Sequence, residues 1–473
     1  MPGRDQPMPE DPLRYAVWLA RRRAGMTQPP YTGTMGAMAT RFDPPSGTRD
    51  FLAGEVGKRE RAFGVIRSVF TRYGFEPLQT PAFERVDVLL GKYGEEADKL
   101  VFKILRRGGR EASGEADLAL RYDHTVPLAR VAAAYGSRLP SPYKRYALGP
   151  VWRAERPGRD RYREFVQCDL DTLGSASPLA DAEVLCAHYD ALAELGIGNF
   201  GVQLNSRRVL AGLLDAFRVP EHLGPGVLTS LDKLDKLPAA EVTAELSQRG
   251  LEPQQAGELV DAMTGPGAGD RIREVLKQSD EGSAGLDEVD SVLSLVAPQL
   301  PPGRIAFTPR MVRGLSYYTG PIWELTAPGV AGSLGGGGRY DRLIAQLGGP
   351  EVPATGSSLG IERILSLLPE HQGPRGRLDV AVTIMDEQFA AQSFGFAATA
   401  RAAGLRASVY LGSARLGRQL RWASDQGARW CLIYGAAEDE TGTVTVRDMS
   451  SGEQTAVPAG DAGAYLARVA AQR

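Results

Sequence analysis

The sequence is poor in cysteine and in long apolar runs. Only three cysteines, Cys168, Cys186 and Cys431, occur in 473 residues, and they are widely scattered. This spacing argues against a disulfide framework or a zinc cage and fits a reducing compartment, so we expect a cytoplasmic protein. No uncharged apolar stretch reaches the roughly eighteen residues that a transmembrane helix needs, and the N-terminus lacks a secretory signal pattern, so no membrane partner is expected.

Histidine is scarce too, and this limits the possible chemistry. The four histidines include no pair at i, i+4 spacing, and no Cys-x-x-Cys occurs, so no metal site held by the protein is expected. Gly356-Ser357-Ser358-Leu359-Gly360 fits the G-x-S-x-G pattern of hydrolases, but only His371 follows Ser358, with no acid placed to orient it. We therefore expect these small residues to give the backbone close access to a ligand rather than to present a nucleophile.

The composition is that of a globular protein. Hydrophobic residues make up 43% and charged residues 24%, and the length suggests two or three domains. The net charge of −2 is nearly neutral, but seven basic residues face three acidic ones between Lys144 and Arg163, with aromatic residues interleaved. This cluster indicates a polyanion site, with a solvated surface loop as the alternative.

The pattern along the chain changes at several points. We expect a weakly ordered extension at 1–40, an antiparallel sheet region at 41–205, a helical insertion at 206–303 and a return of the sheet at 304–370. The Gly/Pro/Arg-rich linker at 371–377 then precedes an alternating α/β module at 378–473. The fold class is therefore α+β with an α/β module at the end.

Two helices and a hairpin can be placed more closely. Phe63, Ile66, Phe70 and Tyr73 recur at spacings of three and four, which predicts a helix from Gly54 to Tyr73. In the last module, the pattern predicts a helix from 413 to 427 and a final hairpin over 444–457.

Four arginines stand beside apolar or aromatic strands in separate stretches. Arg153, Arg161, Arg313 and Arg363 are costly to bury unless they meet anions, so their convergence would suit nucleotide phosphates. The alternative is that each one pairs with a neighbouring acid. The glycine-rich stretch at 332–341 lacks the Lys-Ser/Thr ending of a P-loop and is a weak signal by itself.

Five motifs resemble those of one enzyme family. Arg153-Ala154-Glu155 followed by RYREF (161–165) resembles the second motif of class II aminoacyl-tRNA synthetases, and GSSLGIER, ending in Arg363, resembles their third. The helix before Pro81 is similar to their first. MVRGLSYYTG (311–320) and GGGRYD resemble motifs of histidyl-tRNA synthetases, and the resemblance runs from Gly47 to the C-terminus.

This resemblance implies a fold, a reaction and partners. It implies a class II antiparallel-sheet catalytic domain in 41–205 and 304–370, interrupted by the helical insertion, and an anticodon-binding domain in 378–473. It also implies ligation of L-histidine to tRNA(His) with ATP and Mg²⁺, through histidyl-adenylate, by a homodimer. The rival is a non-catalytic, synthetase-like regulatory subunit of ATP phosphoribosyltransferase, which typically lacks the anticodon domain and loses motif residues.

The resemblance also implies roles for individual residues. Arg313 and Arg153 would be catalytic. The residues implied for ATP binding are Arg153, Glu155, Arg161, Phe165 and Arg363. The residues implied for histidine binding are Asp123, Thr125, Gln167, Asp171, Arg313, Tyr317, Tyr318 and Tyr340. The residues implied for tRNA binding are Arg415, Arg418 and Arg421, which repeat every three positions of a predicted helix, with a solvated helix face as the alternative.

Two positions depart from the family pattern. Ser316 stands where the family usually has Asp, and Asp123 is one methylene shorter than the Glu of many bacterial relatives. The segments RYDHT and REFVQCDLD look more like the eukaryal and archaeal version.

Overall fold

The structure is a computed structural model that describes residues 42–90, 99–106, 113–158, 161–312, 317–369 and 378–471. The predicted extension at 1–40, Arg313, Ser316 and the linker at 371–377 lie outside these residues. Among the residues described, no helix combines the length and the apolar character needed to cross a membrane.

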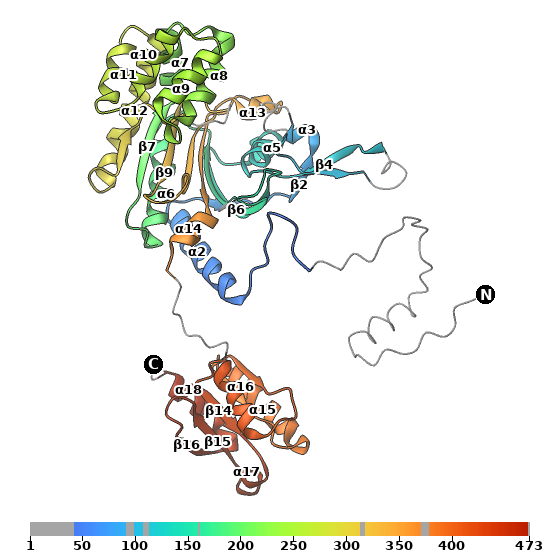
Figure 1. The fold of residues 1–473 in the computed structure, drawn as a ribbon. Coiled ribbons are helices and arrows are strands. Elements are labelled where there is room, and N and C mark those ends of the chain that lie inside the picture. The colour runs from blue at the N-terminus through green and yellow to red at the C-terminus, as the bar shows by residue number, and fades with distance from the viewer. Residues whose placement is uncertain are drawn as a thin grey trace, which may run out of the picture.

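An eight-stranded sheet forms the centre of the larger unit (Figure 1). The five inner pairings are antiparallel, and only the outermost pairs, β1 with β5 and β7 with β8, are parallel. The predicted antiparallel sheet is therefore confirmed. In sheet order the strands are β1 (Glu76–Pro77), β5 (Tyr143–Trp152), β6 (Glu164–Leu173), β11 (Ala354–Gly360), β10 (Gly335–Arg339), β9 (Pro321–Thr326), β7 (Gly201–Ser206) and β8 (Ile305–Phe307).

The two faces of this sheet differ, as β6 illustrates. Side chains alternate along a strand, so Cys168 and Leu170 lie on one face and are fully buried in the main hydrophobic core. That core includes helices α2 (Ala53–Arg72) and α6 (Pro178–Glu194), which contact each other. The opposite face carries the polar residues of β6.

Helix α2 agrees with the prediction to within a residue at each end. It buries Ile66, Val69 and Phe70, and it stops where Gly74 adopts a φ of 77°, which favours glycine. Tyr73, predicted to lie on the buried face, is the C-cap, and its hydroxyl donates a hydrogen bond to Asp190.

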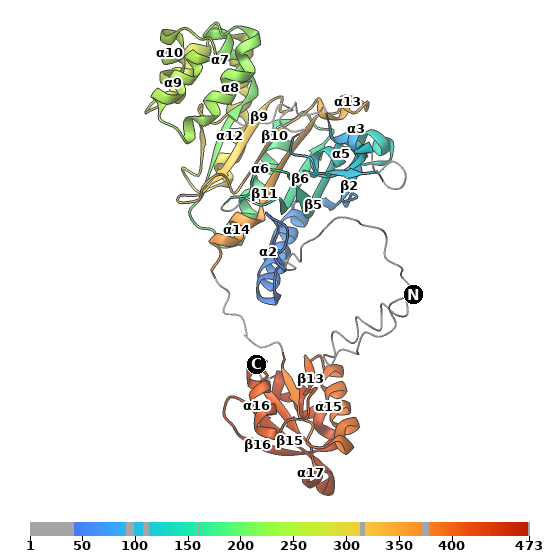
Figure 2. The ribbon, with the colours of Figure 1, turned by 45° about the vertical axis from the view of Figure 1, so that its right-hand side comes forward.

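A small antiparallel sheet and short helices complete this region beside the main sheet (Figure 2). These elements are β2 (Phe83–Arg85), β4 (Ala116–Leu120), β3 (Lys103–Leu105), α3 (Val86–Leu89), α5 (Thr125–Tyr135), α13 (Leu343–Gln346) and α14 (Ile361–Leu367).

All regular structure between Arg207 and Gln299 is helical, as predicted for the insertion. Helices α7 and α12 pack closely because glycines face each other: a Cβ on Gly212 would lie 2.4 Å from the Cα of Gly282. The α-helices are α7 (Arg207–Ala216), α8 (Gly224–Leu231), α9 (Ala239–Gln248), α10 (Pro253–Met263), α11 (Ala268–Leu276) and α12 (Asp280–Val296).

The C-terminal unit has its own five-stranded sheet and its own cores. Strands β13 (Ala407–Val409), β12 (Val380–Val382) and β14 (Trp430–Ile433) are parallel, and the predicted hairpin of β15 (Thr443–Asp448) and β16 (Gln454–Pro458) extends them. The helices are α15 (Ala390–Ala402), α16 (Leu416–Asp425), α17 (Ala436–Thr441) and α18 (Ala462–Ala471). The helix predicted from 413 to 427 is shorter, because Arg415 is its N-cap residue.

Candidate active site

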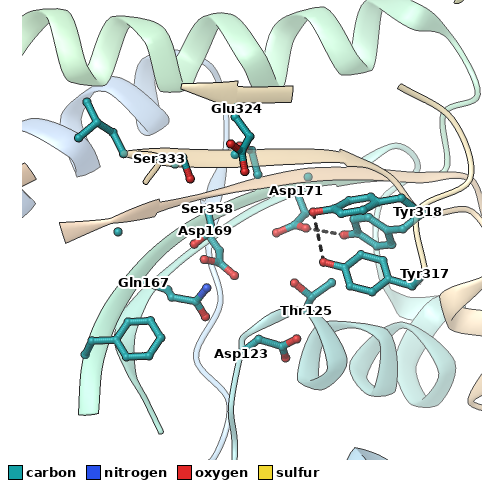
Figure 3. A pocket seen from close by; sticks show the side chains of 18 of the residues that line it. Asp123, Thr125, Gln167, Asp169, Asp171, Tyr317, Tyr318, Glu324, Ser333 and Ser358 are labelled. Carbon is teal, nitrogen blue, oxygen red and sulfur yellow. Dashed lines mark hydrogen bonds between the residues drawn. The ribbon is translucent and has the colours of Figure 1, made fainter. Parts of the chain in front are cut away.

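A cavity of about 450 Å³ opens on the polar face of the large sheet (Figure 3). Strands β6, β9, β10 and β11 form its floor and walls, and the start of α5 and the start of α14 reach it from two sides. Ten predicted site residues line it: Asp123, Thr125, Arg153, Phe165, Gln167, Asp171, Tyr317, Tyr318, Tyr340 and Arg363.

The floor of the cavity follows from strand register. Gln167, Asp169 and Asp171 are alternate residues of β6 and share its polar face. On β11 they stand opposite Gly360, Ser358 and Gly356, respectively. Ser358 is thus a mid-strand residue whose hydroxyl lines the cavity, and it does not occupy the strand-to-helix elbow that a hydrolase nucleophile requires.

Aromatic hydroxyls and one carboxylate meet at one end of the cavity. The hydroxyl of Tyr340 donates a hydrogen bond to Asp171 Oδ1, and that of Tyr317 donates to the hydroxyl of Tyr318 at 3.3 Å. The rings of Tyr317 and Tyr340 contact edge to face, with centroids 5.7 Å apart. Asp123 Oδ1 accepts a hydrogen bond from the Val126 amide at 3.1 Å, which fixes this carboxylate at the start of α5.

Burial dominates the electrostatics of Asp171. It raises the pKa of this carboxyl to about 7, while the charge of Arg145 works in the opposite direction. Arg145 lies opposite Asp171 on β5, and its Nη2 is 2.8 Å from Asp171 Oδ2. Arg145 was counted in the basic cluster predicted to meet a polyanion. That interpretation is wrong for this residue, because it is fully buried and paired within the protein.

Arginine and aromatic side chains line the other end of the cavity. The guanidinium carbon of Arg153 lies 5.1 Å from the centroid of the Phe165 ring, and its Nε donates to the carbonyl of Tyr122 at 3.0 Å. Arg363 Nη1 donates to the carbonyl of Ser333 at 2.8 Å. Arg153, which directly follows β5, and Arg363 on α14 therefore reach the same cavity.

Glu155 and Arg161 do not line this cavity and instead form an ion pair with each other. Although burial works to raise it, the pKa of Glu155 is lowered overall by Arg161, Arg153 and Arg363. Arg161 is therefore paired with a neighbouring acid, Glu155, which was the alternative to a phosphate contact. Arg313, predicted to be catalytic, lies outside the described residues.

Sequence reasoning missed several residues that line the cavity. Asp169 had a usable signal, because it falls between Gln167 and Asp171 at the same strand period. No sequence signal marked two further residues, because only tertiary structure brings them to the cavity. They are Asp232, at the start of a 3₁₀ turn in the insertion, and Glu324 on β9.

The three arginines predicted to bind tRNA are all exposed in the C-terminal unit. Arg418 and Arg421 lie on α16, while Arg415 precedes its first residue, so the predicted three-residue stripe along one helix is reduced to two. Within the described part of the chain, none of the three forms an ion pair.

Comparisons with known proteins agree with this architecture. The sequence profile described as "Histidyl-tRNA synthetase" matches residues 47–364, and the profile described as "Anticodon binding domain" matches residues 379–468. A histidine–tRNA ligase of Gloeobacter violaceus is 37% identical over 468 residues, covering 92% of this chain and 98% of the relative.

Solved structures have a similar fold. A histidyl-tRNA synthetase from Nostoc sp. has a TM-score of 0.72 at 29% identity, covering 91% of this chain and 100% of that one. A Bacillus halodurans protein titled as an ATP phosphoribosyltransferase regulatory subunit/histidyl-tRNA synthetase has a TM-score of 0.70 at 20% identity, covering 84% and 100%, and this supports the fold alone.

The antiparallel sheet, its site and the second module define a class II aminoacyl-tRNA synthetase. The chain belongs to the histidyl-tRNA synthetase family. It is an enzyme that ligates histidine to tRNA. The rival interpretation as a regulatory subunit is not favoured, because such subunits typically lack the anticodon domain, whose profile matches residues 379–468 of this chain.

Proposed function

We propose that this enzyme works in two steps in the cavity on its large sheet. The carboxylate of L-histidine attacks the α-phosphate of ATP, which gives histidyl-adenylate and releases pyrophosphate. The 3′-hydroxyl of the terminal adenosine of tRNA(His) then takes the histidyl group. The observation that carries this proposal is that seven of the eight residues implied for histidine, all but Arg313, and three of the five implied for ATP line a single cavity.

The amino acid would bind where the hydroxyls and carboxylates meet. Asp123 and Thr125, helped by Gln167, would hold the α-ammonium group. Asp171 and Tyr318 would accept and donate hydrogen bonds at the imidazole nitrogens, between the rings of Tyr317 and Tyr340. Buried polar partners that face both nitrogens would reject amino acids that lack either group.

ATP would extend toward the arginine end of the cavity. Arg153 would hold the α-phosphate, and Phe165 and Arg363 would stack on opposite faces of the adenine. Glu155 would face the adenine, and Arg161 would exchange its bond to Glu155 for the γ-phosphate.

The remaining charges of the site would act on the phosphates. Arg313 would bridge the α-phosphate and the histidine carboxylate as a fixed positive charge. Asp232 and Glu324 are oxygen donors of the kind that Mg²⁺ uses, and they would meet the ion that accompanies ATP.

The rest of the chain would serve the tRNA and the assembly. Residues 41–205 and 304–370 would act as the catalytic domain, 206–303 as an insertion and 378–473 as the anticodon-binding domain. Arg415, Arg418 and Arg421 would contact the phosphate backbone of tRNA(His). A homodimer is inferred from the likeness of α2 to the first class II motif.

One assay tests the first step directly. Exchange of labelled pyrophosphate into ATP, measured with each of the twenty amino acids and without tRNA, should occur with histidine alone. Charging of tRNA(His) by the same preparation tests the second step. If purified protein fails to exchange pyrophosphate with histidine, adenylate formation in this cavity is refuted.

A further inference from the structure

Arg145 is a buried guanidinium group that stands opposite Asp171 on β5, on the same face of the large sheet. It has no exposed surface, and its Nη2 contacts Asp171 Oδ2 at 2.8 Å and the carbonyl oxygen of His124 at 3.1 Å. Within the described residues, its Nε and Nη1 have no hydrogen-bond partner. Burying a charge with few hydrogen bonds costs free energy. We therefore expect Arg145 to stabilise another buried charge of opposite sign.

A second buried carboxylate, that of Asp169, lies nearby. Asp169 precedes Asp171 by two residues on the same face of β6, is only 2% exposed and lines the cavity. Its Oδ1 has no hydrogen-bond partner in the described part of the chain. Its neighbours across the sheet, Ala147 on β5 and Ser358 on β11, carry no charge.

The Cα atoms of the two aspartates are about 7 Å apart along the strand, given the rise per residue of an antiparallel strand. In a buried floor, two negative charges at this distance repel each other, and one would take up a proton if nothing offset them. Burial raises the pKa of both carboxyl groups, and Arg145 is the principal positive charge that opposes this rise. Arg121 and Arg153 also act on Asp169, but each bonds a backbone carbonyl elsewhere.

The other titratable groups that face Asp171 do not replace this charge. Tyr340 is neutral because burial raises the pKa of its hydroxyl well above the ordinary value. His124 is neutral because burial lowers the pKa of its imidazole to about 3. Asp123 adds a further negative charge.

We propose that Arg145 is a positioning residue that favours the ionised forms of Asp171 and Asp169, in which the three groups together carry one net negative charge, and that this balance fits the cavity to the N–H group of an imidazole side chain. The inference deepens the proposed function and rests on it. It gives Arg145 and Asp169, to which no role had been assigned, a part in the choice of amino acid.

The balance of charge predicts an unusual pattern among variants. Arg145→Met removes the positive charge and leaves two uncompensated carboxylates, so the KM for histidine should rise about 10-fold or more. Asp169→Asn leaves Arg145 and Asp171 as a pair with no net charge, so it should raise the KM for histidine less. The double variant Arg145→Met/Asp169→Asn again has one negative charge, so its KM should fall back to within about 3-fold of the wild type.

The experiment is histidine-dependent pyrophosphate exchange by full-length protein between pH 6 and 9. The KM for ATP should stay within about 2-fold in all variants, because Arg145 lies away from the arginine end of the cavity. In Arg145→Met, the pH below which histidine binding weakens should move upward, and the double variant should move it back. Free histidine titrates identically in every assay, so differences between variants report the enzyme.

The outcomes separate this inference from the proposed function. Absence of exchange in the wild type overturns the proposed function. An active wild type with a double variant no better than Arg145→Met, or an equal rise in the KM for ATP, overturns the role of Arg145 alone. Should Arg145→Met fail to fold in thermal unfolding, Arg145→Lys decides: it retains the charge, and an unshifted pH dependence supports the proposal whereas a shifted one refutes it.

Discussion

Gly356 stands directly opposite Asp171 where β11 pairs with β6, and a Cβ on Gly356 would lie 1.9 Å from Asp171 Oδ1. The glycine is therefore needed because a side chain of the protein itself occupies the space beside it. We had expected the small residues of this segment to make room for a ligand. At Gly356 the missing side chain instead leaves space for the carboxylate of Asp171, which we propose to bind the imidazole ring.

Gly356→Ala should therefore displace Asp171. We expect the KM for histidine in pyrophosphate exchange to rise about 10-fold or more, with a loss of about 1–3 kcal/mol in the free energy of unfolding from overpacking. The KM for ATP should change little. Unchanged histidine binding would mean that Asp171 does not bind the ring.

Gly360→Ala, in the same segment, should give the opposite pattern. A Cβ at Gly360 finds its nearest neighbour, the carbonyl oxygen of Leu334, at 3.8 Å, so the protein itself accommodates the methyl group. The methyl group would instead enter the cavity near Arg363. We expect a higher KM for ATP, an unchanged KM for histidine and a wild-type unfolding temperature. A variant that binds ATP normally would place the nucleotide elsewhere.

Arg49 joins two elements that we propose to hold ATP. Its guanidinium carbon lies 3.5 Å from the centroid of the Tyr162 ring, next to Arg161, and Nη2 bonds Glu362, next to Arg363. Arg59 also bonds Glu362, at 2.9 and 3.0 Å. Because Arg49 contacts both Glu362 and Tyr162, Arg49→Met should loosen both neighbours, and Tyr162 the more. We expect the KM for ATP in pyrophosphate exchange to rise about 5-fold or more.

A matched control is available on α2. Arg61 is exposed, lines the same surface hollow as Arg49, and in the described structure forms no ion pair. Arg61→Met makes the same chemical change and should leave the KM for ATP at the wild-type value. Equal effects of the two substitutions would show that net charge, and not the bond to Glu362, is responsible.

Much of the fold was predictable because it depends on local patterns. The spacing of Ile66 and Phe70 indicated α2, and the strand pattern predicted an antiparallel sheet across 41–205, the region that contains β6. Family motifs then grouped residues as distant in sequence as Asp123 and Arg363, and both line one cavity.

What could not be predicted depends on pairing between strands. Register places Arg145 opposite Asp171, and the sequence alone gives no sign that this arginine is buried while the other basic residues of the cluster that the structure describes are not. Asp232 reaches the cavity through the packing of a whole helical insertion, which leaves no trace in the residues around it.

Arg313→Ala tests the residue proposed to bridge the two reactants. Loss of a fixed positive charge at the reacting phosphate should lower the rate of pyrophosphate exchange by about 100-fold or more. Far-UV circular dichroism and thermal unfolding should match the wild type. Activity close to that of the wild type would mean that the catalytic role has been assigned to the wrong arginine.

Arg418→Glu tests the proposed contact with tRNA. The position of Arg418 on the helix separates an effect on binding from an effect on stability. Arg418 lies in the first turn of α16, where a positive charge opposes the helix dipole and a glutamate would favour it by about 0.3–1 kcal/mol. The variant should thus be at least as stable as the wild type. We nevertheless expect the KM for tRNA(His) in charging to rise about 10-fold, with unchanged pyrophosphate exchange and a weaker dependence on salt.

The control for this prediction is Arg468→Glu, which makes the same change of charge on the exposed face of α18 in the same unit. Its guanidinium group contacts only the ring of Tyr465 among the described residues. If binding depends on a specific phosphate contact at α16, this variant should charge tRNA(His) normally. If it depends only on the total charge of the unit, both variants should lose the same affinity, and the proposed role of Arg418 would have to be abandoned.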